Sequence, residues 1–296
     1  MKFIAITLLL CASLFANAQF GGPTPLKLIT ERFLNTKTYV VLTGDKKFDE
    51  NLATGFEAFW TLTEFEFIEE NAVLDMKDTT ISYAMPLQLT VTDQYSTREY
   101  IQYGIVLGGE EPLATRNIAN IHFDNYAHEN FINEAAYRAF NLPKLMHNYL
   151  QMRVDGEPIT GATITRIRYT AAALYNQNAT KIKDKTLLVD IKQLQSGPHN
   201  PYKKKTIFSK EKFEKFYDGK VKFVTTEELE EAINQQNPDY TFLLSINSFK
   251  KYIFVIDCES GDMWYNGYEI RGVGITAKDI KRLSKSVNGV PFVKLK

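Results

Sequence analysis

The densest group of possible metal ligands lies between residues 122 and 129. It contains His122, Asp124, His128 and Glu129. Imidazole and carboxylate groups are ligands that zinc and related transition metals use in proteins. The interval between His122 and His128 fits neither one helix face nor a tight loop, and it matches no established zinc motif. His122, Asp124 and His128 are therefore a metal-site hypothesis, polar loop side chains are the simpler interpretation, and we expect no resident cofactor.

A second acidic group surrounds Gly261 and consists of Asp257, Glu259 and Asp262. A calcium ion binds several oxygens from a tight loop, so this turn is a candidate calcium site. The spacing differs from that of an EF-hand, and an acidic hairpin turn needs no metal. We therefore expect a hairpin turn here.

Three further signals for chemistry are weak. Glu64 and Glu66 share one face of an alternating strand, as a glycosidase pair could, but alternation predicts that this face is simply solvated. Gly44 follows a strand and precedes a helix, as in phosphate-binding turns, but it lacks the lysine or further glycines of those motifs. Cys258 is a possible nucleophile, yet its apolar strand predicts a buried thiol.

The segment 197–205 is a basic insertion that contains two prolines and a glycine. These residues oppose regular structure and predict an exposed loop. Tyr202 offers a flat apolar surface beside Lys203, Lys204 and Lys205, so the loop is a candidate contact for an acidic protein surface or a phosphate-bearing polymer. The alternative is a solvated loop. Because 35 basic residues balance 35 acidic ones, we expect no nucleic-acid partner.

The first 18 residues have the order of a signal peptide. Lys2 precedes an apolar run, and small residues at Ala16 and Ala18 predict cleavage before Gln19. Leu10 before Cys11 does not fit a lipobox. We expect an exported protein, periplasmic or secreted, with no transmembrane segment after cleavage and at most a peripheral association with the outer membrane. Its about 278 mature residues (296 minus 18) retain one cysteine, which excludes an internal disulfide.

The elements that position these residues occur twice. KTYVVL at 37–42 and KTLLVD at 185–190 are similar buried strands, and each opens the same series of elements. The fold class that we predict is α/β, in the mixed α+β sense: a tandem duplication of a strand-helix-strand-helix-strand-strand unit, each forming a mixed sheet packed with helices. The first unit is predicted from strands 38–42, 64–68, 82–89 and 99–107 and helix 48–62. The second is predicted from strands 185–190, 221–224, 240–246 and 251–258, helix 209–217, and a helix capped by Thr226 and stopped by Asn237-Pro238.

These elements divide the chain into three parts. Residues 1–18 are the signal peptide, 19–156 are the first repeat with a helical connector, and 157–296 are the second repeat. The connector spans residues 117–156 and holds a predicted helix at 143–152. The boundary lies in the turn-forming run Asp155-Gly156-Glu157-Pro158.

The second half resembles a known envelope-protein pattern. The runs DGKVKFV at 218–224, NPDYTFLL at 237–244, KYIFVID at 251–257 and GDMW at 261–264 are similar to the pattern shared by the N-terminal domain of TolB and the curli secretion protein CsgG. The resemblance is clearest over residues 185–265 and fainter in the first half. It departs from the pattern by the missing lipobox and the insertion at 195–205. It implies an envelope-associated, non-enzymatic, protein-binding α/β domain.

Two functional classes follow. The first is an exported, non-catalytic envelope or secreted protein that binds another protein or an envelope polymer through a duplicated scaffold. The second is a hydrolase of an envelope polymer whose site, between the two repeats, combines residues distant in sequence. The sequence contains no nucleophile elbow or other strong catalytic motif, so the binding scaffold is the preferred hypothesis.

Overall fold

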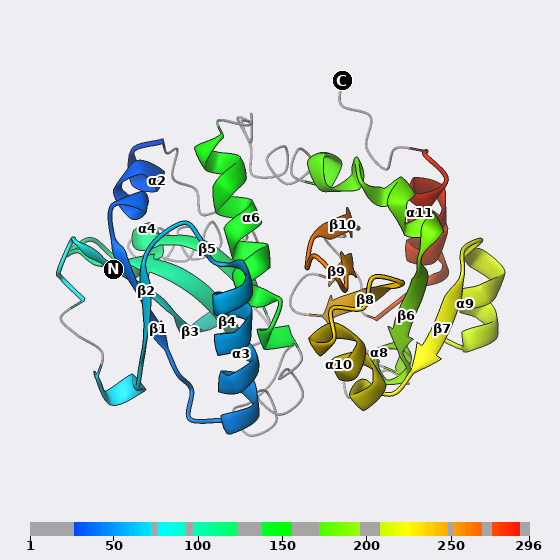
Figure 1. The fold of residues 1–296 in the computed structure, drawn as a ribbon, viewed down its shortest axis with the longest axis horizontal. Helices are drawn as coiled ribbons and strands as arrows, with labels where there is room; N and C mark the ends of the chain where they lie inside the picture. Colours follow the sequence, from blue (N-terminus) through cyan, green and yellow to red (C-terminus); the bar gives the residue numbers. More distant parts are fainter. Residues whose placement is uncertain are drawn as a thin grey trace. The chain divides into compact units, whose positions relative to one another are not determined.

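The computed structural model describes residues 27–72, 76–92, 97–122, 138–155, 172–195, 208–247, 251–267 and 274–290. The chain forms two compact units, Met1–Pro158 and Ile159–Lys296 (Figure 1). Each unit contains one five-stranded sheet. No helix among the described residues is both long enough and apolar enough to span a bilayer.

Unit 1 is a mixed sheet with helices. In chain order its elements are α2 (Lys27–Leu34), β1 (Lys37–Val41), α3 (Lys46–Phe59), β2 (Phe65–Ile68), the 3-10 turn η1 (Glu70–Ala72), β3 (Ile81–Thr92), β4 (Thr97–Leu107), α4 (Leu113–Arg116), β5 (Asn117–His122) and α6 (Leu142–Val154). The strands lie in the order β2-β1-β3-β4-β5. Strands β2, β1 and β3 run parallel to one another. Strand β4 is antiparallel to β3, and β5 is antiparallel to β4.

Unit 2 repeats this plan. Its elements are η2 (Ala179–Asp184), β6 (Thr186–Asp190), α8 (Ile191–Gln195), α9 (Lys210–Phe216), β7 (Val221–Val224), α10 (Thr226–Asn234), β8 (Tyr240–Asn247), β9 (Lys251–Asp257), β10 (Met263–Asn266) and α11 (Ala277–Val287). The strands lie in the order β7-β6-β8-β9-β10, with β7, β6 and β8 parallel and β9 and β10 antiparallel. Strands β1 and β6 occupy equivalent places, so the predicted fold class is confirmed.

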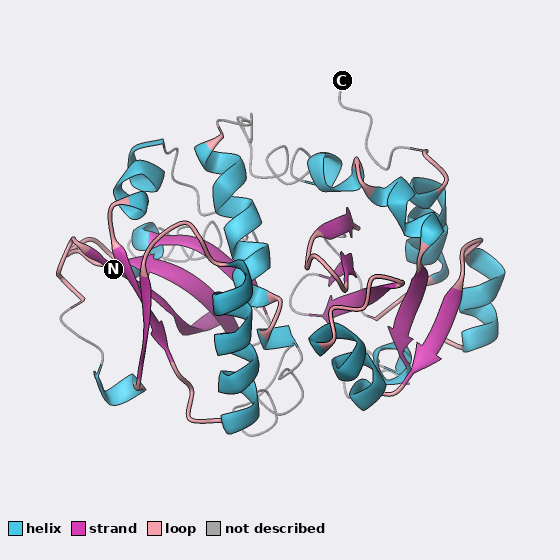
Figure 2. Cartoon of the chain, viewed as in Figure 1, coloured by secondary structure: helices cyan, strands magenta, loops and turns pink. Residues whose placement is uncertain are grey.

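The helices follow the same duplication (Figure 2). In unit 1, α6 packs against α3 and α2; in unit 2, α11 packs against α9 and η2. Residues at equivalent register positions supply the apolar surface beneath them. Phe67 of β2 lies opposite Val40 and contacts Phe56 of α3, while Phe223 of β7 lies opposite Val189 and contacts Phe213 of α9. The repeat therefore includes the packing of the helix layer as well as the strand order.

Side-chain caps begin these helices where the sequence turns. Asp45 accepts a hydrogen bond from the Phe48 N–H at the start of α3, and Ser209 accepts one from the Lys212 N–H at the start of α9. Such caps satisfy backbone donors that have no partner inside the helix. The predicted cap Thr226 is wrong by one residue. Thr225 caps α10 in a capping box with Glu228, and the Thr226 hydroxyl donates to Asp190 (2.8 Å) instead.

The two units differ in the connector that precedes the third parallel strand. In unit 2 this connector forms α10. Its residues Leu229 and Ile233 are buried, but they are not part of the core cluster that contains Phe213 of α9 and Ile280 of α11. In unit 1 the described residues between β2 and β3 contain only the 3-10 turn η1. The predicted strand-helix-strand-helix order is therefore complete in unit 2, while in unit 1 the second helix is replaced by this turn among the described residues.

Strand β5 corrects the assignment of residues 117–122 to a helical connector. Ile118, Ala119, Asn120 and Ile121 are all buried. Because both faces of the strand are covered, the residues do not alternate between apolar and polar, and the buried asparagine makes the run look like a loop. Strand β5 is the counterpart of β10, at the same edge of its sheet.

Candidate functional site

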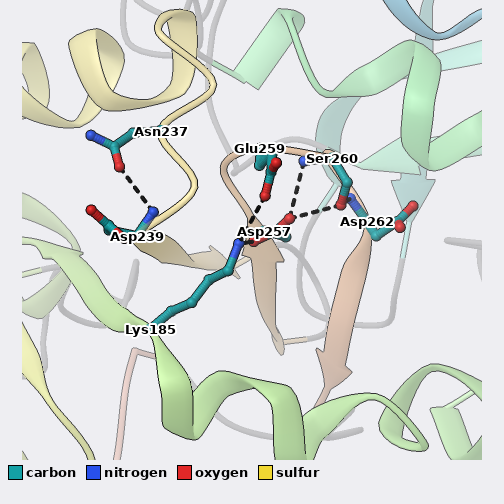
Figure 3. Close-up of polar contacts among 7 residues, drawn as sticks. All are labelled: Lys185, Asn237, Asp239, Asp257, Glu259, Ser260 and Asp262. Atoms are coloured by element: carbon teal, nitrogen blue, oxygen red, sulfur yellow. Dashed lines mark hydrogen bonds and ion pairs between the residues drawn. The ribbon is translucent and has the colours of Figure 1, made fainter.

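The β9–β10 hairpin carries the acidic residues that sequence analysis considered for calcium (Figure 3). Asp257 ends β9, and its side chain is buried. One carboxylate oxygen accepts a hydrogen bond from Lys185 Nζ at 2.6 Å; the other accepts from the Ser260 N–H at 3.0 Å and the Ser260 hydroxyl at 2.8 Å. Both carboxylate oxygens of Asp257 therefore already have partners, one in the Lys185 ammonium and the other in the turn at Ser260.

Lys185 reaches this turn from the position just before β6. Its ammonium also lies 3.4 Å from Glu259 and 5.0 Å from the centroid of the Trp264 ring. Burial alone lowers the pKa of Lys185, but the hydrogen bond and charge of Asp257, assisted by Glu259, outweigh it and raise this pKa. The lysine remains charged and occupies the position that a calcium ion would need. Among the described residues no group of three or more His, Cys, Asp or Glu side chains is arranged to hold a metal.

The neighbouring turn in Figure 3 is also structural. The Asp239 N–H donates to the side-chain oxygen of Asn237 at 2.9 Å, immediately before β8 begins. This is the local side-chain-to-backbone bond that asparagine makes in turns. It sets the start of the strand next to Asp257.

A second ion pair in unit 2 is more deeply buried, and sequence analysis did not identify it. Lys251 opens β9 and is 2% exposed, and its ammonium lies 2.6 Å from the carboxylate of Asp279, which is 4% exposed. The same oxygen of Asp279 accepts from the Thr276 N–H at 2.8 Å and from the Thr276 hydroxyl at 2.6 Å, in the capping box of α11. The pair therefore connects the sheet to the first turn of α11.

The turn from β1 to α3 resembles a phosphate-binding turn only in outline. Gly44 has a φ of 81°, which favours glycine. The N–H groups of Thr43 and Gly44 donate to the two carboxylate oxygens of Asp49, each at 2.9 Å. Because Asp49 of the chain itself occupies the place of the anion, the geometry supports a structural turn.

In unit 2 the region beyond the carboxyl end of β6 is also occupied by a side chain of the protein itself, that of Gln193. Open α/β sheets commonly bind ligands beyond the carboxyl ends of their parallel strands, where the crossovers diverge. Here Gln193 of α8 donates to the Leu243 carbonyl at 3.1 Å and accepts from the Ser245 N–H at 2.7 Å. Its amide satisfies backbone groups of β8 beyond the end of β6.

Cys258 has the environment of a core thiol. It is 1% exposed. Burial and the charge of Asp257 raise its pKa to about 12, although the charge of Lys185 acts in the opposite direction. We predict that the folded protein will not react with a thiol-specific reagent at pH 8, because the thiol is both covered and protonated. Stoichiometric labelling after denaturation is the control. Rapid labelling of the folded protein would show that the thiol is accessible.

The predicted solvated pair Glu64 and Glu66 lies at an edge of the first sheet. Both side chains are exposed, and Glu66 forms an ion pair with Lys37 at 2.6 Å. Strand β7 has the equivalent place in the second sheet, and its exposed charges are Lys220 and Lys222. Among the described residues, both units therefore share an exposed, charged sheet edge.

Several predicted site residues lie outside the described residues. They are the signal peptide at 1–18, Asp124, His128, Tyr202, Lys203, Lys204 and Lys205. The backbone of His122 is described and ends β5 opposite Gln102. These assignments remain predictions. Comparison of the chain with models of protein families, with curated proteins and with solved structures gave no match.

Proposed function

We propose that this protein is an exported, non-catalytic scaffold of the cell envelope or its surroundings, which binds another protein or an envelope polymer. One observation carries the proposal: both units present an equivalent outer strand, β2 or β7, with exposed charges between half-exposed apolar residues. An outer strand has unpaired backbone groups that can accept an added strand. A duplicated unit with two such edges offers two points of attachment.

The roles of the reactive side chains support the same function. Asp257 and Asp279 are bound by lysines, Asp49 closes a turn, and Cys258 is a protonated core thiol. The two buried carboxylates have the partners that buried charges require, and Asp49 and Cys258 have structural roles. The signal-like first 18 residues and the resemblance to the TolB and CsgG pattern favour an envelope location.

The experiment is a pull-down from native envelope extract with the tagged mature protein, at low and high salt, followed by mass spectrometry. We expect a bait whose N-terminus is at or near Gln19 and a partner that is enriched at low salt. Two variants divide the surface: Glu64→Lys with Glu66→Lys at β2, and Lys203→Ala with Lys204→Ala and Lys205→Ala in the basic insertion. Loss of the partner with one variant assigns the contact.

Three results would contradict separate parts of this proposal. Recovery of the uncleaved chain from the cytosol would contradict export. Cleavage of an envelope polymer by the purified protein would contradict a non-catalytic role and favour a hydrolase. A partner whose salt-dependent binding survives both variants would exclude these two contact surfaces.

A further inference from the structure

The two outer strands have the same place and the same alternation. In β2 the residue Glu66 lies opposite Tyr39 of β1, and in β7 the residue Lys222 lies opposite Leu188 of β6. Among the described residues, β2 pairs only with β1 and β7 pairs only with β6. Each strand therefore leaves its outer side unpaired within that part of the chain.

The side chains of β2 and those of residues 221–223 in β7 are at least partly accessible. The apolar residues Phe65 and Phe67 of β2, and Val221 and Phe223 of β7, are all half-buried. They share the face that carries α3 or α9: Phe65 and Phe67 contact the ring of Phe56, Phe223 contacts that of Phe213, and Val221 packs against the core cluster that contains Phe213. The charged residues alternate with them and are exposed. A strand added to either edge would meet apolar residues on one face and charges on the other.

The charges on the two edges are opposite. The segment of β2 reads Glu64-Phe65-Glu66-Phe67, and that of β7 reads Lys220-Val221-Lys222-Phe223. Like charges on paired strands are destabilising and unlike charges are stabilising. Pairing of β2 with β2, or of β7 with β7, therefore opposes like charges. Because the two sheets have the same strand order and carry α3 or α9 on the same face, antiparallel pairing of β2 with β7 places glutamates beside lysines on one face and apolar residues together on the other.

We propose that β2 of one molecule pairs with β7 of a second copy of this chain, which joins their sheets edge to edge. This inference rests on the proposed function as a binding scaffold and names its partner. The contact uses two different surfaces, so after one pairing one molecule retains its β7 edge and the other retains its β2 edge. Such head-to-tail contacts form closed rings or open filaments. Because the charges are exposed, high salt weakens the association.

The test uses charge reversal and analytical ultracentrifugation of the purified mature protein over a range of concentrations. We expect the wild-type protein to associate at low salt and to dissociate at high salt. Glu64→Lys with Glu66→Lys makes both edges basic, and Lys220→Glu with Lys222→Glu makes both acidic. Each of these variants alone should lose association. An equimolar mixture of the two should regain it, because every contact between one variant and the other brings a basic edge to an acidic edge.

A fourfold variant that exchanges the charges of the two edges should associate like the wild type. Lys183→Glu with Lys285→Glu is the control, since both residues are exposed and the change in net charge equals that of the β7 variant. Circular dichroism checks that each variant is folded.

A wild-type protein that remains monomeric at low salt, or edge variants that associate unchanged, would overturn the inference. So would a mixture of the two double variants that stays monomeric, since unlike charges on facing edges would then not drive the association. The proposed function would survive these results if the wild type still captured an envelope partner that the β2 variant lost.

Discussion

Lys251→Met will lower the free energy of unfolding of unit 2 by about 3–5 kcal/mol, the effect typical of breaking a buried ion pair. The substitution removes the ammonium that lies 2.6 Å from Asp279, and both side chains are almost fully covered. The Asp279 carboxylate then remains buried with only its bonds to Thr276. Desolvation without a counter-ion is the source of the loss.

The partner and the double variant test this explanation. Asp279→Asn leaves Lys251 as an unpaired buried cation, so it should be destabilising to a similar degree. Lys251→Met combined with Asp279→Asn removes both charges and should lose much less than the sum of the two single changes. Additive losses would show that the two residues act independently, and this would contradict the role assigned to the pair.

The two tryptophans allow unit 2 to be measured by itself. Trp60 lies in unit 1 and Trp264 in unit 2, and both are buried. In a Trp60→Phe background, the emission of Trp264 during denaturant unfolding reports the midpoint of unit 2. An unchanged midpoint for Lys251→Met would exclude a stabilising ion pair.

The repeated architecture was predictable because it depends on local patterns. β1 and β6 contain short apolar runs that come directly after a Lys-Thr pair, and β2 and β7 alternate between apolar and charged residues. The turns at Asp45 and Ser209 contain side chains that cap helices. Each of these signals lies within a few residues of the element that it specifies, so one sequence is sufficient to place it.

Helix α11 and strand β5 were not predicted, and their local signals differ in strength. Helix α11 has Ile280, Leu283 and Val287 at helical spacing after the cap Thr276, so its sequence contained the information. Strand β5 is buried on both faces and therefore lacked alternation.

The contacts that determine the candidate site were beyond this kind of prediction. Lys251 and Asp279 are 28 positions apart, and Lys185 and Asp257 are 72 apart. Nothing in the local pattern of a lysine tells whether it will be solvated or will neutralise a distant carboxylate. The acidic turn around Gly261 consequently resembles a cation site in the sequence. In the fold the cation at this turn is the ammonium of Lys185, which lies just before β6.

Lys185→Met will lower the stability of unit 2 by about 3 kcal/mol at neutral pH, because Asp257 then lacks its counter-ion in a buried position. Lys185 is 15% exposed and Asp257 is 2% exposed. Water can partly replace the lost ammonium on the Lys185 side, so we expect the lower end of the range for buried pairs. Lys183→Met, an exposed change two residues earlier, should alter stability by no more than about 0.5 kcal/mol.

The difference between wild type and Lys185→Met should depend on pH in a defined direction. The pKa of Lys185 is raised above its ordinary value of 10.5 in the folded protein. A raised pKa of a basic group adds stability that is fully present below the pKa of the unfolded chain and is lost as pH rises through the folded pKa. The two proteins should therefore differ by a constant amount from neutral pH to about pH 9, and they should converge above about pH 10.5. Denaturant midpoints of both proteins, followed through Trp264 across this range, measure the convergence. A difference that grew with rising pH would mean that the charge of Lys185 does not stabilise the hairpin.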